Sequence, residues 1–292
     1  MKKSVIVLMV VLMLFGSFSV VFAAGIKEPP KATLENWKSL VDAEVKAAKF
    51  NTGVYIYDVK RDDTYAFNAD AKIRSASIIK LFILNHLFTQ VKNGQSKLSD
   101  VVIFDHNKAV DGGMLHKFSS GATLRLEDMA LFMLGVSDNT ATNLFIDYFG
   151  MDKINETIQA FGVKNTILGR KMLDSEARKA GRDNFTCAED VGRLLTSFIK
   201  ADPRILDMLS LQKNRNKLPS ALGFEDADDL EPVLAHKTGE LGGIEHDSGV
   251  FFYASDHPVV VVVLTENLPD VQTGFKYIGR IGKIVYDAFN AE

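Results

Sequence analysis

The chain has 292 residues, of which 47% are hydrophobic and 24% are charged, and its formal net charge is −3. This composition is typical of a globular protein that is long enough to bury a substantial core. The sequence contains no long basic run, so its charge pattern gives no support to nucleic-acid binding.

Residues 1–23 have the pattern of a signal peptide. Lys2 and Lys3 precede a long apolar stretch, and Ala23 and Ala24 stand where a signal peptidase requires small residues. An uncleaved membrane anchor is the alternative, because the apolar run is nearly long enough to span a bilayer. We expect cleavage, and therefore an exported protein that is periplasmic or extracellular, with no stable membrane insertion afterwards.

The predicted elements that follow change in type along the chain. A helix is expected over residues 34–48, and then a hairpin whose strands cover 53–59 and 64–69. The pattern is helical from residue 76 to about 204, and its apolar segments are 78–91, 126–136, 139–150 and 188–200. After about residue 230 a second hairpin is expected over 249–254 and 258–266, and an amphipathic helix over 274–290 closes the chain.

This order of elements predicts the α+β class. Strands from both ends of the chain can form one antiparallel sheet, with the helical block inserted between them. We therefore expect a discontinuous sheet domain of residues 24–75 and 205–292, and an all-helical domain of residues 76–204.

Lys80 stands among large apolar residues, where burial disfavours the ammonium form and lowers its pKa. Ser77 lies three positions earlier, so a helix would place both side chains on one face. A lysine with a lowered pKa can act as a base toward a hydroxyl, and a helix start favours a developing oxyanion. Alternatively, Ser77 only caps the helix and Lys80 reaches the surface. This segment alone favours neither interpretation.

Two further motifs favour the catalytic interpretation of Ser77 and Lys80. The Ser-x-x-Lys pattern also begins at Ser197 and Ser210, but only Ser77 lies where a polar stretch meets a buried helix. Ser137-Asp138-Asn139 follows as a corner between two apolar helices, and Lys237-Thr238-Gly239 precedes the last strands. Each motif is common by itself, whereas the order of the three carries information.

In this order the motifs resemble those of the penicillin-recognising serine hydrolases. The spacing from Ser77 to Ser137 and the run SDNTATNLF are similar to class A β-lactamases in particular. The resemblance covers nearly the whole chain after the signal segment. It implies an antiparallel five-stranded sheet flanked by helices, with an inserted all-α domain.

The resemblance also implies roles for individual residues. Ser77 would be the acylated nucleophile, Lys80 its proton partner, and Ser137 the relay of a proton to the leaving nitrogen. Asn139 would bind the acyl-amide side chain of the substrate. The remaining substrate-binding residues would be Lys237 and Thr238 at the substrate carboxylate, Gly239 in the same motif, and the backbone N–H of Glu240, which would form an oxyanion hole with that of Ser77.

The sequence departs from the class A pattern at one position. Class A enzymes carry a glutamate in a Leu-x-Arg-x-Glu run, where it activates the water that releases the acyl group. This chain has Met172 at that position, and a thioether cannot act as a base. Asp174 or Glu176 could supply a shifted carboxylate, or both could be solvated loop acids. Asp183 could form a structural pair with Arg170.

We therefore expect a serine hydrolase that opens the β-lactam amide through an acyl-enzyme. The alternatives are a D-Ala-D-Ala carboxypeptidase or esterase, and a covalent β-lactam-binding protein with poor deacylation. No cofactor and no metal are expected, because the six histidines form no zinc motif. His236 and His246 could line the cleft. The expected partner is a small β-lactam or peptidoglycan-like substrate, and the protein is expected to be a monomer.

Overall fold

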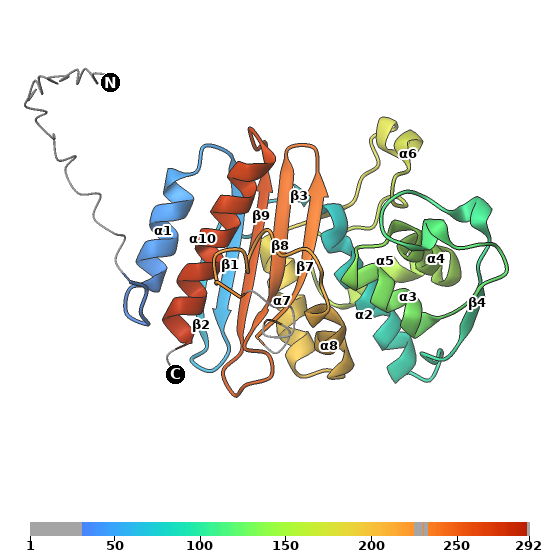
Figure 1. Ribbon diagram of the computed structural model, residues 1–292, viewed down its shortest axis with the longest axis horizontal. Helices are drawn as coiled ribbons and strands as arrows, with labels where there is room; N and C mark the ends of the chain where they lie inside the picture. Colours follow the sequence, from blue (N-terminus) through green and yellow to red (C-terminus); the bar gives the residue numbers. More distant parts are fainter. Residues whose placement is uncertain (1–30, 225–229, 231–232, 291–292) are drawn as a thin grey trace, which may run out of the picture. The chain divides into compact units, whose positions relative to one another are not determined.

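The computed structural model describes residues 31–224, 230 and 233–290, so the predicted signal peptide lies outside the described residues. A five-stranded antiparallel sheet with the order β2-β1-β9-β8-β7 forms its centre (Figure 1). Its strands come from both ends of the chain, as predicted: β1 (Asn51–Asp58), β2 (Asp63–Phe67), β7 (Leu234–Leu241), β8 (Ile244–Phe251) and β9 (Val259–Glu266).

The apolar run of β9 results from its central place in the sheet. Val259, Val261 and Val263 face one hydrophobic core, whereas the alternate residues Val260 and Val262 face the other. Successive side chains of a strand point to opposite faces, so a strand covered on both faces is apolar at every position. The valine run is therefore the sequence pattern of a strand that is buried on both sides.

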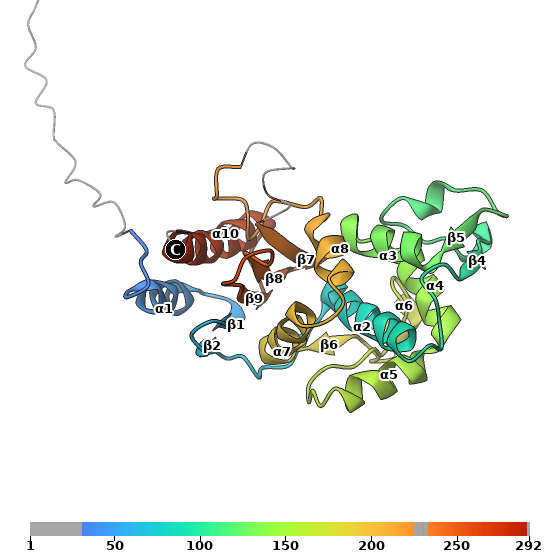
Figure 2. The same cartoon turned by 90° about the horizontal axis from the view of Figure 1, so that it is seen from below.

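Helices cover both faces of this sheet. Helices α1 (Trp37–Ala47) and α10 (Val271–Phe289) pack on each other, and α10 lies against β8 and β9. Helix α7 (Ala188–Ile199) packs on the opposite face against β1, β8 and β9 (Figure 2). Helix α8 (Arg204–Ser210) contacts the edge strand β7. The antiparallel sheet flanked by helices is thereby confirmed.

The inserted helical region is built around α2 (Ile79–Lys92), which is apolar and buried on almost every side. The other helices of this region are α3 (Leu126–Gly135), α4 (Asn139–Phe149), α5 (Met151–Ala160) and the short α6 (Ser175–Lys179). Two small antiparallel pairs were not predicted, because each strand has only two or three residues: β3 (Ile73–Arg74) with β6 (Phe185–Thr186), and β4 (Val101–Ile103) with β5 (Thr123–Arg125). The domain limits given above stay a prediction.

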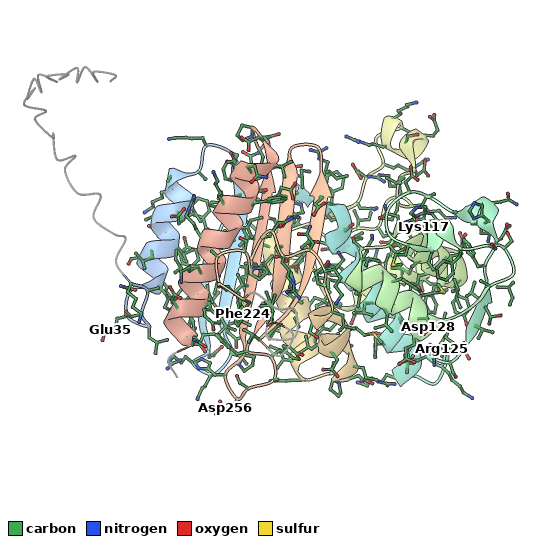
Figure 3. The ribbon with its side chains drawn as sticks, in the orientation of Figure 1. Glu35, Lys117, Arg125, Asp128, Phe224 and Asp256 are labelled. Carbon is green, nitrogen blue, oxygen red and sulfur yellow. The ribbon has the colours of Figure 1, made fainter. Side chains whose placement is uncertain are left out.

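Polar side chains fix the start of α3 at the surface. Arg125 precedes the helix, and its guanidinium donates to both carboxylate oxygens of Asp128 over 2.9 and 2.7 Å. Both residues are labelled in Figure 3. An acidic residue in the first turn also suits the positive end of the helix dipole. In the part of the chain that the structure describes, no helix is long and apolar enough to cross a membrane.

Candidate active site

Ser77 lies in a 3₁₀ turn, Ala76–Ile78, that leads directly into α2. Ala76 has a φ of 45°, a left-handed conformation that an alanine adopts only when its surroundings hold it there. Ile78 and Ile79 on either side of the junction are fully buried, whereas Ser77 keeps partial exposure. The Ser77 side chain caps neither the turn nor α2, so the interpretation of Ser77 as a mere helix cap is wrong.

Lys80 is fully buried, so it does not reach the surface. Its Nζ donates to the carbonyl oxygen of Ser137 over 2.6 Å and to Oδ1 of Asn139 over 2.9 Å, and it lies 3.1 Å from Ser137 Oγ. Burial lowers the pKa of Lys80 well below its usual value, and the positive charge of Lys237 lowers it further. Both effects favour the neutral amine form of Lys80, whose lone pair can accept a proton.

Ser137 joins two lysines through one hydroxyl. Its φ of 54° places it in the left-handed region at the corner between α3 and α4. Lys237 on β7 donates to Ser137 Oγ over 3.0 Å and to the carbonyl oxygen of Thr238 over 2.8 Å. Because the same hydroxyl lies beside Lys80, protons can pass between the two amines. The structure thus brings together residues of all three sequence motifs.

Asp138 and Asn139 fasten one wall of the site. The buried carboxylate of Asp138 accepts backbone N–H groups of Met114, Leu115 and Ala141 over 2.6 to 2.8 Å. Asn139 Nδ2 donates to the carbonyl oxygen of Asp111 over 2.9 Å. The loop passes so close that a Cβ on Gly113 would lie 2.3 Å from an Asp138 oxygen, and the φ of Gly113 is 93°. Only glycine fits there.

Two cavities meet at Ser77. One has a volume of about 480 Å³, and the other, on the side of the loop 170–175, has about 260 Å³. Ser77, Asn139 and Glu240 line both cavities. Ser77, the predicted nucleophile, therefore lies between two cavities.

The edge strand β7 forms the wall opposite Asn139. Phe252 N donates to the carbonyl oxygen of Val233 over 2.6 Å, and this contact fixes which residues of β7 and β8 exchange hydrogen bonds. Along an antiparallel pair, residues that hydrogen-bond to the partner strand alternate with residues that do not. Gly239 therefore bonds to β8, whereas the N–H of Glu240 points away from β8, to the free edge of the sheet. A Cβ on Gly239 would lie only 3.2 Å from Cβ of Ala76, so glycine lets β7 approach the serine turn.

The loop that carries Met172 is held to α4 by one asparagine. Asn143 Oδ1 accepts the N–H of Met172 over 2.7 Å, and Asn143 Nδ2 donates to the Met172 carbonyl oxygen over 3.2 Å. The predicted pair of Arg170 and Asp183 is confirmed, with Nε and Oδ1 2.8 Å apart. The Met172 side chain is 7% exposed and lines the smaller cavity, together with Ser77.

The two nearby acids, Asp174 and Glu176, have other partners in this structure. Asp174 lines the smaller cavity, but its Oδ1 accepts the N–H of Ala177 over 2.9 Å and caps α6. The side chain of Glu176 is 80% exposed and pairs with Lys179 outside the cavity. Among the described residues, no carboxylate is hydrogen-bonded to Ser77 or Lys80.

We expect Asn143→Ala to loosen this loop. The substitution leaves the buried N–H and carbonyl groups of Met172 without partners, which costs about 1–3 kcal/mol of unfolding free energy. Urea denaturation measures the loss, and limited proteolysis locates it. Asn107→Ala, at an exposed position, is the control and should change neither. Equal stability of the two variants would contradict the conclusion that Asn143 holds this loop to α4.

Other candidate residues of the sequence lie outside the site. His236 and His246 are buried and line neither cavity: His236 Nδ1 lies 2.9 Å from Oδ1 of Asp247, and His246 Nε2 lies 2.9 Å from the Arg74 carbonyl oxygen. The prediction that they could line the cleft is wrong. In the described ranges, no cluster of His, Cys, Asp and Glu side chains could hold a metal ion.

The other two Ser-x-x-Lys copies are structural. Ser197 Oγ donates to the carbonyl oxygen of Leu194 over 2.7 Å, and Ser210 Oγ donates to that of Asp207 over 2.8 Å. Each hydroxyl therefore bonds to its own helix, a common arrangement for serine. A third cavity, of about 540 Å³, lies beside Ser197 between α2, α7 and α8 and contains none of the predicted site residues.

Sequence reasoning missed three residues that shape the site. Asn143 follows Asn139 by four positions on α4, and this helical spacing could have indicated it. Gly113 had a weaker signal, the Gly-Gly pair in a polar stretch. Lys217, a buried lysine beside Glu240, had none, because its contacts come from strands more than twenty residues away.

Comparison with solved structures defines the class of the fold. A β-lactamase from Sphaerobacter thermophilus is 27% identical, with a TM-score of 0.75, and the match covers 88% of this chain and 98% of that one. PBP-A is 25% identical, also with a TM-score of 0.75, over 90% of this chain and 99% of its own. An ancestral class A β-lactamase, 18% identical with a TM-score of 0.75, shares the fold. The fold is that of the class A β-lactamases.

The sequence profile of the Beta-lactamase enzyme family matches residues 36–289. The chain therefore belongs to this family, as the resemblance predicted. It is 21% identical over 269 residues to the extended-spectrum β-lactamase PER-1 of Pseudomonas aeruginosa, which covers 85% of this chain and 86% of that protein. It is 22% identical to the β-lactamase CARB-3 of the same organism, over 86% of this chain and 91% of the relative.

Proposed function

We propose that the protein is a serine hydrolase that opens β-lactam amides through an acyl-enzyme on Ser77 and releases the acyl group slowly. The observation that carries the proposal is the hydrogen-bonded group of Lys80, Ser137 and Lys237 at the junction of two cavities that Ser77 lines. Family membership supports the reaction class.

In the proposed acylation, Ser77 Oγ attacks the lactam carbonyl carbon and Lys80, as a neutral amine, takes the hydroxyl proton. In this structure Ser77 Oγ makes no hydrogen bond to a described residue, and such contacts often tighten only when substrate binds. The backbone N–H groups of Ser77 and Glu240 stabilise the oxyanion. The C–N bond then breaks, Ser137 delivers its hydroxyl proton to the nitrogen, and protonated Lys80 returns a proton to Ser137.

The rest of the site holds the substrate in this proposal. Lys237 and Thr238 bind the substrate carboxylate, because an ammonium and a hydroxyl together supply charge and a directed donor. Asn139 donates to the acyl-amide side chain with its Nδ2, while its Oδ1 keeps the contact to Lys80. Gly239 keeps β7 close to the serine turn.

Deacylation is the slow step in this proposal. It requires a base to activate water, and the position of that base holds Met172, whose side chain has no titratable group. If deacylation is slow enough, the protein acts as a covalent penicillin-binding protein, and the similarity to PBP-A supports this second candidate function. A D-Ala-D-Ala carboxypeptidase or esterase would use the same acylation machinery.

Timed intact-mass measurement with benzylpenicillin, while ring opening is followed, tests the proposal. A transient adduct with continued ring loss supports a β-lactamase. A persistent stoichiometric adduct supports the penicillin-binding function. If neither adduct nor ring loss appears, β-lactams are not the substrate, and turnover of a D-Ala-D-Ala peptide is the next assay.

The site also predicts a pH dependence. Burial first, and then the charge of Lys217, lower the pKa of Lys237 to about 7. Lys237 can bind a carboxylate ion only while it is protonated, so the second-order acylation rate constant should fall as pH rises above about 7. Stopped-flow measurement between pH 5 and 9 gives the profile. In Lys237→Arg the guanidinium stays charged, so the fall near pH 7 should disappear. The same fall in both proteins would contradict this role of Lys237.

We also propose that the protein works outside the cytoplasm as a single chain. The signal-peptide pattern of residues 1–23 supports export. Cell fractionation with an antibody against the folded part tests the location, and sedimentation of the purified protein tests the oligomeric state.

A further inference from the structure

Lys217 is a fully buried lysine that the proposed mechanism does not use. It lies in the segment after α8, and its side chain lines neither cavity at Ser77. Its Nζ makes three polar contacts: 3.2 Å to the carbonyl oxygen of Gly239, 2.9 Å to Oε1 of Glu240 and 2.7 Å to Oε2 of Glu245. The first two contacts are hydrogen bonds, and the third is an ion pair.

One of these contacts reaches a peptide group with a special position. The Gly239 carbonyl and the Glu240 N–H belong to the same peptide unit, and in a trans peptide they point in opposite directions. The alternation along β7 and β8 turns the carbonyl toward β8 and the N–H toward the free edge, where Glu240 lines both cavities. Lys217 therefore contacts the back of the peptide whose front is the proposed oxyanion donor.

A positive charge at a peptide oxygen changes the nitrogen end as well. The C–N bond has partial double-bond character, so electron density drawn to the oxygen leaves the N–H more positive. Hydrogen bonds in such a chain strengthen each other by roughly 10–30% per bond. Because Lys217 is buried, water does not weaken this effect.

We propose that Lys217 is a positioning residue that polarises the Gly239–Glu240 peptide and so strengthens the Glu240 N–H as an oxyanion donor. The inference rests on the proposed function, because it needs an oxyanion at that N–H. Lys217 also fixes the direction of this donor, since its contacts to Glu240 and Glu245 anchor adjacent ends of β7 and β8. Its own segment is fixed as well, because Leu218 N donates to Oδ2 of Asp247 over 3.0 Å.

Lys217 lies between two carboxylates, which oppose its positive charge. Glu240 and Glu245 are its carboxylate partners, Asn214 Nδ2 donates to Glu240 Oε1, and the Phe275 ring lies 5.7 Å from Nζ. Burial raises the pKa of Glu245, an effect that Lys217 opposes. A purely structural role, anchoring the segment through this ion cluster, is therefore the alternative that an experiment must separate from polarisation.

The test replaces Lys217 by methionine, which keeps the length of the side chain without the ammonium. Acylation by benzylpenicillin is timed by intact mass, and the ester carbonyl stretch of the acyl-enzyme is recorded by infrared difference spectroscopy with ¹³C-labelled substrate. Both are measured about one pH unit below the Lys237 pKa of about 7, where Lys237 is protonated. This choice separates the effect from the charge that Lys217 exerts on Lys237.

We expect Lys217→Met to acylate about 3- to 10-fold more slowly, a fraction of the 10²- to 10³-fold loss for removing a whole oxyanion donor. The ester stretch should move to higher wavenumber, because a weaker donor polarises the carbonyl less. Lys217→Arg keeps a positive charge, so it should retain part of the acylation rate and part of the lower wavenumber of the ester stretch. Glu245→Gln is the matched control. It removes one charge of the ion cluster but keeps the contact of the Lys217 ammonium with the Gly239 carbonyl, so the wavenumber of the ester stretch should not change.

The outcomes separate the inference from the function on which it rests. If the unaltered protein forms no adduct, the proposed function fails. If the unaltered protein acylates, and Lys217→Met has the same acylation rate and the same ester stretch, only the inference about Lys217 is overturned. An equal rate loss in Lys217→Met and Glu245→Gln, without a shifted stretch, also overturns it in favour of anchoring. If Lys217→Met does not fold, Lys217→Gln serves for the same comparison.

Discussion

Ser77→Ala is expected to abolish the covalent penicillin adduct and to reduce ring opening by roughly 10³-fold or more. Alanine keeps the small size of the side chain but removes the oxygen that forms the ester, and Lys80 is too deeply buried to replace it. Intact mass after mixing with benzylpenicillin measures the adduct directly.

The chain supplies matched controls for this experiment. Ser197→Ala and Ser210→Ala remove the serines of the other two Ser-x-x-Lys patterns, whose hydroxyls bond to carbonyl groups of their own helices. Both variants should form the adduct at the normal rate. An adduct that survives in Ser77→Ala would end the hypothesis that Ser77 is the nucleophile.

Met172→Glu is expected to shorten the lifetime of the acyl-enzyme by about 10²- to 10⁴-fold, the range that a positioned general base contributes. Asn143 holds the backbone of residue 172 through its N–H and its carbonyl, and the side chain lines the cavity that also contains Ser77. A carboxylate there is placed to activate water beside the ester. Decay of the adduct mass after removal of free penicillin gives the rate.

Met172→Gln is the control for this variant, because it has the size and polarity of glutamate without a basic oxygen. Both variants replace a side chain that is 7% exposed, so each should lose about 1–2 kcal/mol of stability. Only the glutamate variant should accelerate deacylation. Equal adduct lifetimes in the two variants would show that residue 172 does not position the water, and Asp174→Asn would then be the next variant to measure.

Much of the fold could be predicted because its signals are local or periodic. The valine run of β9 and the apolar α2 identify elements that are buried on every side. The two predicted hairpins are present as β1–β2 and β8–β9, because short turns join strands that pair directly. The order of elements predicted that strands from both ends share one sheet, but the pairing of β1 with β9 was not predicted, because those strands are about 200 residues apart and no local signal joins them.

By itself, the sequence determined the three motifs and their order, the family, and the absence of a glutamate at position 172. Only the tertiary structure decided that Lys80 is buried against Ser137, that both histidines lie outside the cavities, and that Asp174 caps a helix. It also placed Lys217 behind the Glu240 peptide. The physical reason is that a motif fixes which groups are present, whereas burial, charge balance and hydrogen-bond direction depend on neighbours from distant segments.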